Sequence, residues 1–499
     1  MKMTDSWKGW AAAFVLMLVA VTLQNHAVYA TSASTGPTNY TYTYNEWGIP
    51  VPSPDAYRVT AFIMGEDLGI GHFNNPRDLV IFQNYIYVAD TGNNRVVVIR
   101  INEDNTYEVA NLIYYAIMDG TPTTFDRPFG IFVSSWRQTY GQIWLADTHN
   151  NRILHLDAYW NVITEIGAPT ELSLLDEEMN DFLPEKISVD FSGRAFVQAR
   201  HINRGLMEFD LNGTFAGYMG SPPVEVSPVD QFWRMIATQD QRERRIRHVP
   251  VEYNNVSIDH EGFLFVTTSS IGVDPVRRLN ILGEDVMIRN GFEDPIGDLW
   301  WGEAAQRTGP SVFIDVAALP NDTFVAFDRV RGRLFSYDSQ GNLLYVWGGP
   351  GFRTGHFMLP VALDNKGYTL FALDAQTAAI TRFDLTDYGR LINEGLVYYQ
   401  RGMYVESAAA WQEVLRLNGN FGPAYIGIAR SLLRQGYYRD AMRYFRLQND
   451  AQNFGRAFGF YRRQWVEEHF WIFGIALATV VFLPMIVKKV VAVRKELRE

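Results

Sequence analysis

The sequence contains no cysteine among its 499 residues. Disulfides, thiolate metal sites, iron–sulfur clusters and cysteine nucleophiles are therefore excluded. Several enzyme signatures are also missing: the G-x-S-x-G nucleophile elbow, the H-E-x-x-H zinc helix and the phosphate-binding G-x-x-x-x-G-K-[ST] loop. The nine histidines are scattered singly along the chain. These absences lead us to lean against an enzyme.

The net charge is unevenly distributed along the chain. The net charge is −11, and five Lys or Arg residues lie within the last twelve positions. The body of the chain is thus acidic and repels phosphate backbones, so we expect no nucleic-acid partner. Aromatic residues make up 14% of the chain and glycine contributes 40 residues, which favours strands and tight turns over a helical bundle.

The N-terminus has the pattern of a signal peptide over residues 1–30. Lys2 and Lys8 precede an apolar run, and Val28 and Ala30 suit a cleavage site before Thr31. The alternative is an uncleaved membrane anchor. The run is short for a bilayer core of about 30 Å, which favours cleavage.

The C-terminus contains a second apolar run over residues 470–487, with no charged residue. At about 1.5 Å per residue, this run is long enough to cross a thin bilayer. A basic tail, residues 488–499, follows at once and predicts a cytoplasmic C-terminus. We therefore expect a single-pass protein of the cell membrane with residues 31–469 extracytoplasmic; the alternative is a buried core helix. A long exported chain without cysteine suits a bacterial source.

Two segments between these ends repeat one pattern, residues 74–100 and residues 125–157. Each has proline, an apolar strand, a turn, a second strand that ends in Ala-Asp, the sequence Thr-x-Asn-Asn-Arg and a third strand. The pattern resembles the NHL-repeat β-propeller family. Weaker copies begin near Leu183, Val256, Val312 and Leu359. The resemblance implies a mainly β fold, a six-bladed propeller over residues 57–385 with four strands in each blade.

Ring closure has a candidate strand. Residues 57–64 are strand-like and precede the first copy, whereas the sixth copy ends after its third strand near Asp384. We expect the N-terminal strand to complete the last blade, which removes two exposed sheet edges. Residues 31–56 are then an N-terminal linker.

Aspartate and arginine recur five positions apart within the copies: Asp90 and Arg95, Asp147 and Arg152, Asp328 and Arg333. The asparagines between them tolerate left-handed backbone, and the aspartate can accept backbone N–H bonds. Because the pair recurs in several blades, we interpret it as a structural blade motif. Gluconolactonase-like propellers, by resemblance, hold a divalent cation in the channel, and Asp374 ends an equivalent strand. A membrane-tethered hydrolase of that kind is the alternative function; otherwise no cofactor is expected.

Residues 390–468 lose the strand pattern and become helical. Small and aromatic residues recur at a spacing of 34, as in Gly395 with Ala429 and Trp411 with Phe445. This pattern resembles a pair of tetratricopeptide (TPR-like) repeats. Such a pair is either a docking groove for a partner or a rigid stalk.

Two insertions interrupt the repeats, at residues 221–251 and 285–310. The first contains Trp233, Arg244 and Arg245, and the second contains Asp298, Trp300 and Trp301. Loops on a rigid scaffold often carry function. Tryptophans beside carboxylates can stack on sugar rings and bind hydroxyls, or they can cover an apolar blade edge.

The combined pattern leads to one expectation. We expect a membrane-anchored binding scaffold, an accessory or sensor subunit of a membrane complex such as a solute transporter. Its partners would be a membrane protein complex or an extracellular ligand such as a carbohydrate, with the bilayer contacted through residues 470–487.

Overall fold

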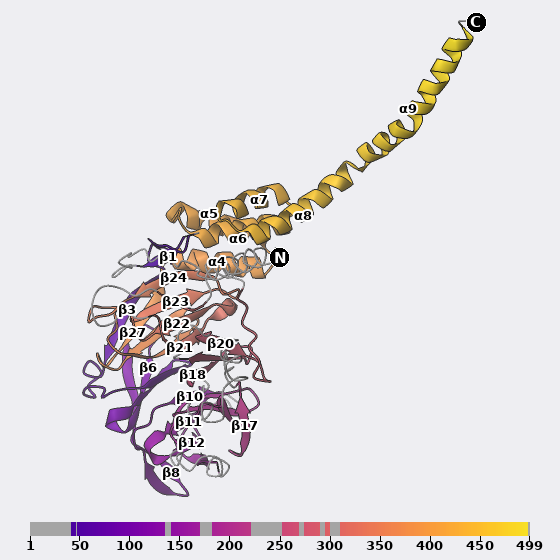
Figure 1. Cartoon of the computed structure of the whole chain (residues 1–499). Coiled ribbons are helices and arrows are strands. Elements are labelled where there is room, and N and C mark those ends of the chain that lie inside the picture. Colours follow the sequence, from indigo (N-terminus) through magenta and orange to yellow (C-terminus); the bar gives the residue numbers. More distant parts are fainter. Residues whose placement is uncertain are drawn as a thin grey trace, which may run out of the picture.

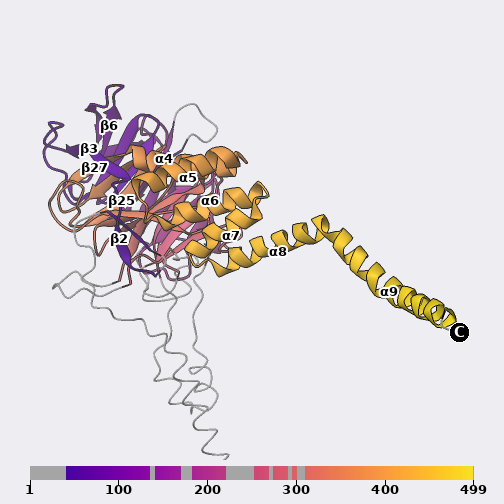
Figure 2. The ribbon, with the colours of Figure 1, turned by 90° about the horizontal axis from the view of Figure 1, so that it is seen from above.

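The computed structural model describes residues 41–45, 47–134, 141–169, 182–220, 252–268, 274–289, 295–299 and 310–497. They form a β-propeller, a layer of α-helices beside it, and a long helix that leads away (Figures 1 and 2). The expected mainly β fold, a six-bladed propeller with a C-terminal helical segment, is confirmed. The predicted signal peptide lies outside the described residues.

Each blade is an antiparallel sheet in which consecutive strands are neighbours. From the channel outward, blade 1 consists of β4 (Asp78–Phe82), β5 (Tyr85–Asp90), β6 (Arg95–Ile101) and β7 (Tyr107–Ile113), and blade 2 of β10 (Ile131–Ser134), β11 (Gln142–Asp147), β12 (Arg152–Leu156) and β13 (Val162–Ile166). In the same order, blade 3 consists of β14 (Pro184–Val189), β15 (Ala195–Ala199), β16 (Leu206–Phe209) and β17 (Phe215–Met219), and blade 4 of β18 (Tyr253–Ile258), β19 (Leu264–Thr268) and β20 (Val276–Leu279). Blade 5 consists of β21 (Phe313–Ala318), β22 (Phe324–Asp328), β23 (Arg333–Tyr337) and β24 (Leu343–Gly348), and blade 6 of β25 (Pro360–Lys366), β26 (Thr369–Asp374) and β27 (Ala379–Leu385). A separate hairpin, β8 (Tyr115–Met118) and β9 (Thr121–Thr124), joins blades 1 and 2.

The N-terminal strand closes the ring as expected. Strand β3 (Tyr57–Met64) pairs antiparallel with β27, with Met64 opposite Ala379 and Tyr57 opposite Leu385. The innermost strands of neighbouring blades contact one another around the channel. Hydrophobic clusters fill each gap between adjacent blades, so every blade is stabilised by two neighbours.

Two blades differ from the expected four strands. Blade 4 has three strands among the described residues, because the chain after β20 forms only an isolated bridge between Leu279 and Asp285. Side chains take the place of regular pairing there: Asp285 Oδ1 accepts the Arg278 N–H, and Arg289 donates to the carbonyl of Val276. Among the described residues, this blade therefore shows three of the four expected strands.

Blade 5 gains two strands from the segment expected to be a linker. Strand β1 (Tyr42–Tyr44) pairs with β24, with Tyr42 opposite Val346, and β2 (Pro50–Pro52) pairs with β1. The two prolines of β2 lie on the outer edge of the sheet, where a missing N–H prevents further pairing. We call β1 and β2 the N-terminal hairpin.

The repeated Asn-Asn turn has the backbone that the sequence predicts. A 3₁₀ turn, η1 (Thr91–Asn93), is followed by Asn94 with φ of 50°. The equivalent turn η2 (Thr148–Asn150) is followed by Asn151 with φ of 55°. Asparagine tolerates this left-handed conformation, so the expectation for these pairs is confirmed. We call the propeller face with these turns the motif face.

Helices begin on the opposite face, directly after β27. They are α4 (Asp387–Gln400), α5 (Tyr404–Leu417), α6 (Gly422–Arg434), α7 (Tyr438–Leu447), α8 (Ala451–Glu468) and α9 (Phe470–Glu496). The first begins slightly before the predicted boundary at 390, because the Thr386 hydroxyl caps it by accepting the Gly389 N–H. Each helix from α4 to α7 packs against the next. The end of α4 also contacts blade 5, where the Gln400 amide donates to the Asn321 carbonyl. We call the propeller face on which these helices lie the helix face.

The last helix extends away from the rest of the chain (Figure 1). Residues Phe470–Arg494 are long and apolar enough to span a membrane, with a mean hydropathy of 2.4 and no residue buried inside the protein. The helix continues beyond the predicted span 470–487 through the basic residues Lys488 and Lys489.

Candidate functional site

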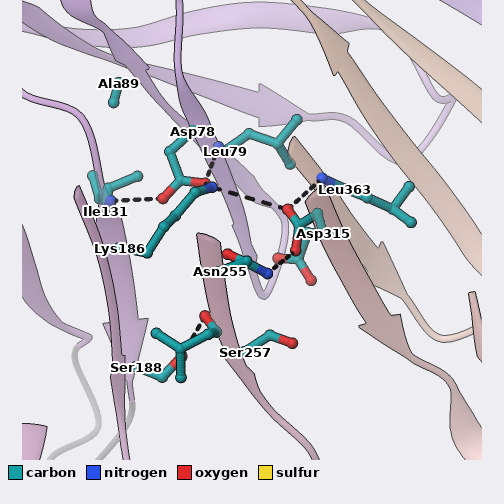
Figure 3. Close-up of polar contacts among 12 residues, drawn as sticks. Asp78, Leu79, Ala89, Ile131, Lys186, Ser188, Asn255, Ser257, Asp315 and Leu363 are labelled. Atoms are coloured by element: carbon teal, nitrogen blue, oxygen red, sulfur yellow. Dashed lines mark hydrogen bonds and ion pairs between the residues drawn. The ribbon is translucent and has the colours of Figure 1, made fainter. Parts of the chain in front are cut away.

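The innermost strands of four blades place a polar side chain at the same position beside the channel. These are Asp78, Lys186, Asn255 and Asp315, which lie opposite Ala89, Gln198, Thr267 and Phe327 of the second strands. We call these four side chains the channel ring, and Figure 3 shows them turned toward one another. A ring of charges in a channel is a candidate site because the blades hold it rigidly.

Lys186 links the acidic members of the ring. Its Nζ lies 2.5 Å from Asp78 Oδ1 and 3.9 Å from Asp315 Oδ2. The Asn255 amide donates to Asp315 Oδ1 at 2.5 Å. The ammonium group therefore lies between two carboxylates (Figure 3), in the place that a bound cation would otherwise take.

The carboxylates of the ring also bind the backbone of the next blade. Asp78 Oδ2 accepts the Ile131 N–H at 3.0 Å, and Asp315 Oδ2 accepts the Leu363 N–H at 2.8 Å. These bonds join blade 1 to blade 2 and blade 5 to blade 6. The channel ring therefore holds neighbouring blades together and also places charged side chains across the channel.

Burial and mutual charge set the ionisation of the ring. Burial raises the pKa of Asp78 above its ordinary value and raises the pKa of Asp315 to about 6, although Lys186 opposes both shifts. Burial alone would lower the pKa of Lys186, but the carboxylates of Asp78 and Asp315 outweigh it and raise that pKa. Lys186 thus stays cationic at neutral pH.

A cavity of about 240 Å³ lies on the helix-face side of the channel ring. It is lined by the residues that follow the ring in the innermost strands, including Ile81, Ser188, Ser257 and Asp364. Asp364 Oδ2 accepts the Ile81 N–H at 2.6 Å, and burial raises the pKa of Asp364 to about 7. The cavity, which we call the channel cavity, has room for a small polar ligand.

The Asp/Arg pairs of the blade motif lie in the turns, away from the channel ring. Asp90 Oδ2 accepts the Arg95 Nε–H at 2.7 Å, and its other oxygen accepts the Asn74 N–H. Asp147 and Arg152 repeat the ion pair at 2.9 Å. These aspartates are fully buried. Their hydrogen bonds hold the motif-face turns in place.

The other two motif aspartates are held in the same way by backbone groups. Asp328 Oδ1 accepts the Val312 N–H at 3.0 Å, and Asp374 Oδ2 accepts the Leu359 N–H at 2.8 Å. Arg333 Nη1 donates to the Tyr42 hydroxyl and lies 3.2 Å from Asp298 Oδ2. This arginine therefore anchors the N-terminal hairpin to blade 5.

Trp233, Arg244, Arg245, Trp300 and Trp301, the expected binding residues, lie outside the described residues. The chain on either side of them is described. Gly220 and Glu252 lie at the motif-face ends of β17 and β18, and Ser311 precedes β21 at the same face. Residues 221–251 and 300–309 therefore leave and rejoin the propeller on the motif face.

Asp298 has a different role from the one expected within its insertion. The sequence suggested a carboxylate able to bind ligand hydroxyls. Asp298 is instead fully buried, accepts hydrogen bonds from the Tyr42 and Tyr44 hydroxyls, and forms an ion pair with Arg331 at 3.1 Å. It fastens the second insertion to the N-terminal hairpin.

Groups placed to hold a metal ion gather at one other position among the described residues. Ligand atoms of His260, Glu261 and Asp322 lie within 4.8 Å of one another. They are exposed at helix-face turns of blades 4 and 5, and Glu261 is bound by Arg278 at 2.7 Å. This set lies outside the channel. The alternative hydrolase would need its metal ion inside the channel.

Sequence reasoning missed the channel ring. The signal was present, because each member directly precedes an apolar residue at the start of its strand: Asp78-Leu79, Lys186-Ile187, Asn255-Val256 and Asp315-Val316. Aligning the copies at this position, rather than at the Ala-Asp end of the second strand, brings the four residues into one column.

The comparison with protein-family models agrees with this architecture. The family model described as NHL repeat matches residues 73–99, which lie in blade 1. No curated protein matches the sequence. Virginiamycin B lyase from Staphylococcus aureus is similar at 10% identity over 66% of this chain and 100% of that chain, with a TM-score of 0.41. The allergen Mala s 1 from Malassezia sympodialis is similar at 9% identity over 62% and 93%, with a TM-score of 0.37. At these identities and TM-scores, neither likeness carries an argument about the fold or the function of this chain.

Proposed function

We propose that the protein is an extracytoplasmic binding scaffold anchored in the cell membrane, an accessory or sensor subunit of a complex such as a solute transporter. One observation carries the proposal. Blades 5 and 6 share a single hydrophobic core with α4, α5 and α6, and the same row of helices continues into the apolar helix α9. A shared core of this kind couples the propeller rigidly to α4, α5 and α6, from which the helices lead to the candidate membrane anchor.

The joint between propeller and helices is built from large buried side chains. Trp347 of blade 5 stacks on Tyr57 of blade 6 with ring centroids 4.7 Å apart. Trp411 of α5 is 2% exposed and packs against Gly395 and Gly427, where any added Cβ would lie within 3 Å of the indole. Close helix packing at small residues, together with the spacing of 34 between Gly395 and Ala429 in the sequence, supports a TPR-like pair.

The helical segment also offers a place for a partner. A groove of about 350 Å³ lies between the N-terminal hairpin, the start of α6 with the loop before it, and the end of α7, and it is lined by Asn45, Val51, Tyr425, Leu447 and others. Beside it, Trp47 is 71% exposed and Ile49 is 52% exposed. Exposed aromatic and aliphatic groups around a groove are typical of a protein interface. This supports a docking role rather than a stalk alone.

Ligand binding is assigned to the motif face. The described residues next to 221–251 and 300–309, the stretches that contain Trp233, Arg244, Arg245, Trp300 and Trp301, lie at the motif face, opposite the face from which the helices lead to α9. In our proposal the motif face is directed away from the membrane and meets an extracellular ligand such as a carbohydrate. The channel ring argues against the hydrolase alternative, since Lys186 already neutralises the carboxylates that a channel metal would need.

Membrane fractionation tests the proposal. The full chain should remain in the membrane pellet after carbonate washing, and a chain that ends at His469 should be released as folded protein. A partner membrane protein should co-purify with the full chain in mild detergent, and this association should weaken when Trp47 is replaced by Asp. Release of the full chain by carbonate, or copurification that is unaffected by Trp47→Asp, would argue against the scaffold.

A further inference from the structure

Two arginines and one aromatic ring meet at the motif-face mouth of the channel. Arg77 and Phe129 occupy the same position in neighbouring blades, just before the channel ring, since their N–H groups bind the carbonyls of Ala89 and Ala146. The guanidinium carbon of Arg77 lies 5.4 Å from the Phe129 ring centroid, and that of Arg200 lies at the same distance. Both cations are therefore held beside one ring.

The two arginines differ in their counter-ions. Arg200 forms an ion pair with Glu185, whose Oε1 accepts the Arg200 Nε–H at 2.8 Å. No carboxylate of the described residues lies within ion-pair distance of Arg77, and its Nε is buried without a hydrogen-bond partner there. Burial also lowers the pKa of the Arg77 guanidinium, although the Glu185 carboxylate opposes this shift from beyond ion-pair distance. A partly buried cation without a counter-ion destabilises the folded chain.

Three other arginines that stack on aromatic rings in the described part of the propeller have carboxylate partners, namely Arg194, Arg278 and Arg333. Arg204 stacks on Tyr218 without an ion pair among the described residues, but it is exposed to solvent. Arg194 lies 5.4 Å from the Phe196 ring and binds Asp190 at 2.7 Å and Glu208 at 2.9 Å. The same stacking geometry is thus found with and without carboxylate partners. Among the described residues, Arg77 is the partly buried one of these stacked arginines that has no carboxylate within ion-pair distance.

We propose that Arg77 binds the carboxylate of a small-molecule ligand at the motif-face mouth of the channel. The guanidinium fork matches a carboxylate, and Phe129 fixes its orientation. Glu185 and Glu252 lie close to Arg200, so the surroundings repel a dianion and favour a single negative charge. The channel ring lies across the channel below this site. It therefore prevents the ligand from entering the channel further than the mouth. The inference does not depend on the proposed membrane role.

Thermal unfolding of the full chain in detergent tests the site. The probes are acetate, benzoate and glucuronate, with glucose as a neutral control and inorganic phosphate as a dianion, all at constant ionic strength. At least one carboxylate should raise the Tm of the wild type, with a larger shift than phosphate or glucose. In Arg77→Met the apparent Kd for that carboxylate should rise at least about tenfold, as expected for a lost hydrogen bond to a charged group.

Two further variants make the result specific. Arg194→Met removes an equally stacked arginine that has its own partners, so it should lower the Tm but keep the carboxylate response. Arg77→Met should not lower the Tm without ligand. If Arg77→Met folds poorly, Arg77→Lys keeps the charge but loses the fork, and its response should weaken. A wild type that responds to no carboxylate, a stronger response to phosphate, or an unchanged response in the Arg77 variants would overturn the proposal.

Discussion

Lys186 Nζ lies 2.5 Å from Asp78 Oδ1, so an ion pair joins the third blade to the first across the channel. The same ammonium group lies 3.9 Å from Asp315 Oδ2 in the fifth blade. Both aspartates also bind backbone N–H groups of the following blade. The channel ring therefore connects blades that share no other side-chain ion pair in the described part of the chain.

Replacing Lys186 by methionine should destabilise the propeller strongly. The change leaves Asp78 and Asp315 buried without their cation, and removing one partner of a buried ion pair costs about 3–5 kcal/mol. Denaturant unfolding of the detergent-solubilised chain, followed by tryptophan fluorescence, measures this loss. The double variant Asp78→Asn/Lys186→Met should lose much less than the sum of the single variants. Additive losses would show that the pair does not act as a unit.

Stability should fall as the pH rises from about 4 to about 7. Burial raises the pKa of Asp364 to about 7 from an ordinary value of 3.8. Between these values the folded chain keeps a proton that the unfolded chain has lost, so the free energy of unfolding decreases with rising pH. Asp315, with a pKa of about 6, acts in the same direction.

The variant Asp364→Asn isolates this effect. The asparagine carbonyl can still accept the Ile81 N–H but does not titrate. The Tm of the wild type should drop more steeply than that of Asp364→Asn between about pH 4 and pH 7, the range between the two pKa values. Parallel Tm profiles for the two proteins, or a wild-type Tm that rises over this range, would contradict the assignment.

The joint between α4 and the propeller should be sensitive to one added methyl group. A Cβ at Gly389 would lie 2.3 Å from the Ala56 carbonyl oxygen, so the backbone must shift. Overpacking of this kind costs about 1–3 kcal/mol. Gly419→Ala is the matched control, because its Cβ would meet only the Leu415 oxygen at 3.9 Å. We expect Gly389→Ala to lower the Tm and Gly419→Ala to leave it nearly unchanged; equal melting curves would mean that the joint is loose.

Replacing Trp300 and Trp301 distinguishes a role in binding from a role in packing against a blade. If they contact ligand or partner, replacing both by alanine should weaken binding with little change in Tm, since each blade keeps its own core. If they cover a blade, each truncation should cost about 3–5 kcal/mol. A thermal melt of the double variant beside the wild type decides between these results, and a large drop in Tm would remove the main support for the binding surface.

The fold could be predicted because its pattern is local and repeated. Alternating apolar residues define strands such as β6, with the sequence RVVVIRI, and the Asp-Arg spacing marks the turn before it. The missing partner of the sixth copy also identified β3 as the closing strand. Each of these signals lies within a single blade or at the two ends of the propeller.

Long-range pairings explain what the sequence did not reveal. Lys186 and Asp78 are 108 residues apart and meet only when the ring closes. Tyr42 pairs with Val346 through a three-residue strand that is too short to show a pattern of its own. Asp298 looked like a ligand group because it lies near tryptophans and carboxylates in the chain, but its partners come from the N-terminal hairpin and blade 5.

The orientation of the chain in the membrane tests the central claim most directly. Intact cells expressing the full chain with a C-terminal tag would be treated with protease and then analysed for the propeller and for the tag. The scaffold account predicts that the propeller is digested from outside, while a tagged fragment containing α9 and the basic tail survives. Protection of the propeller together with loss of the tag would contradict it.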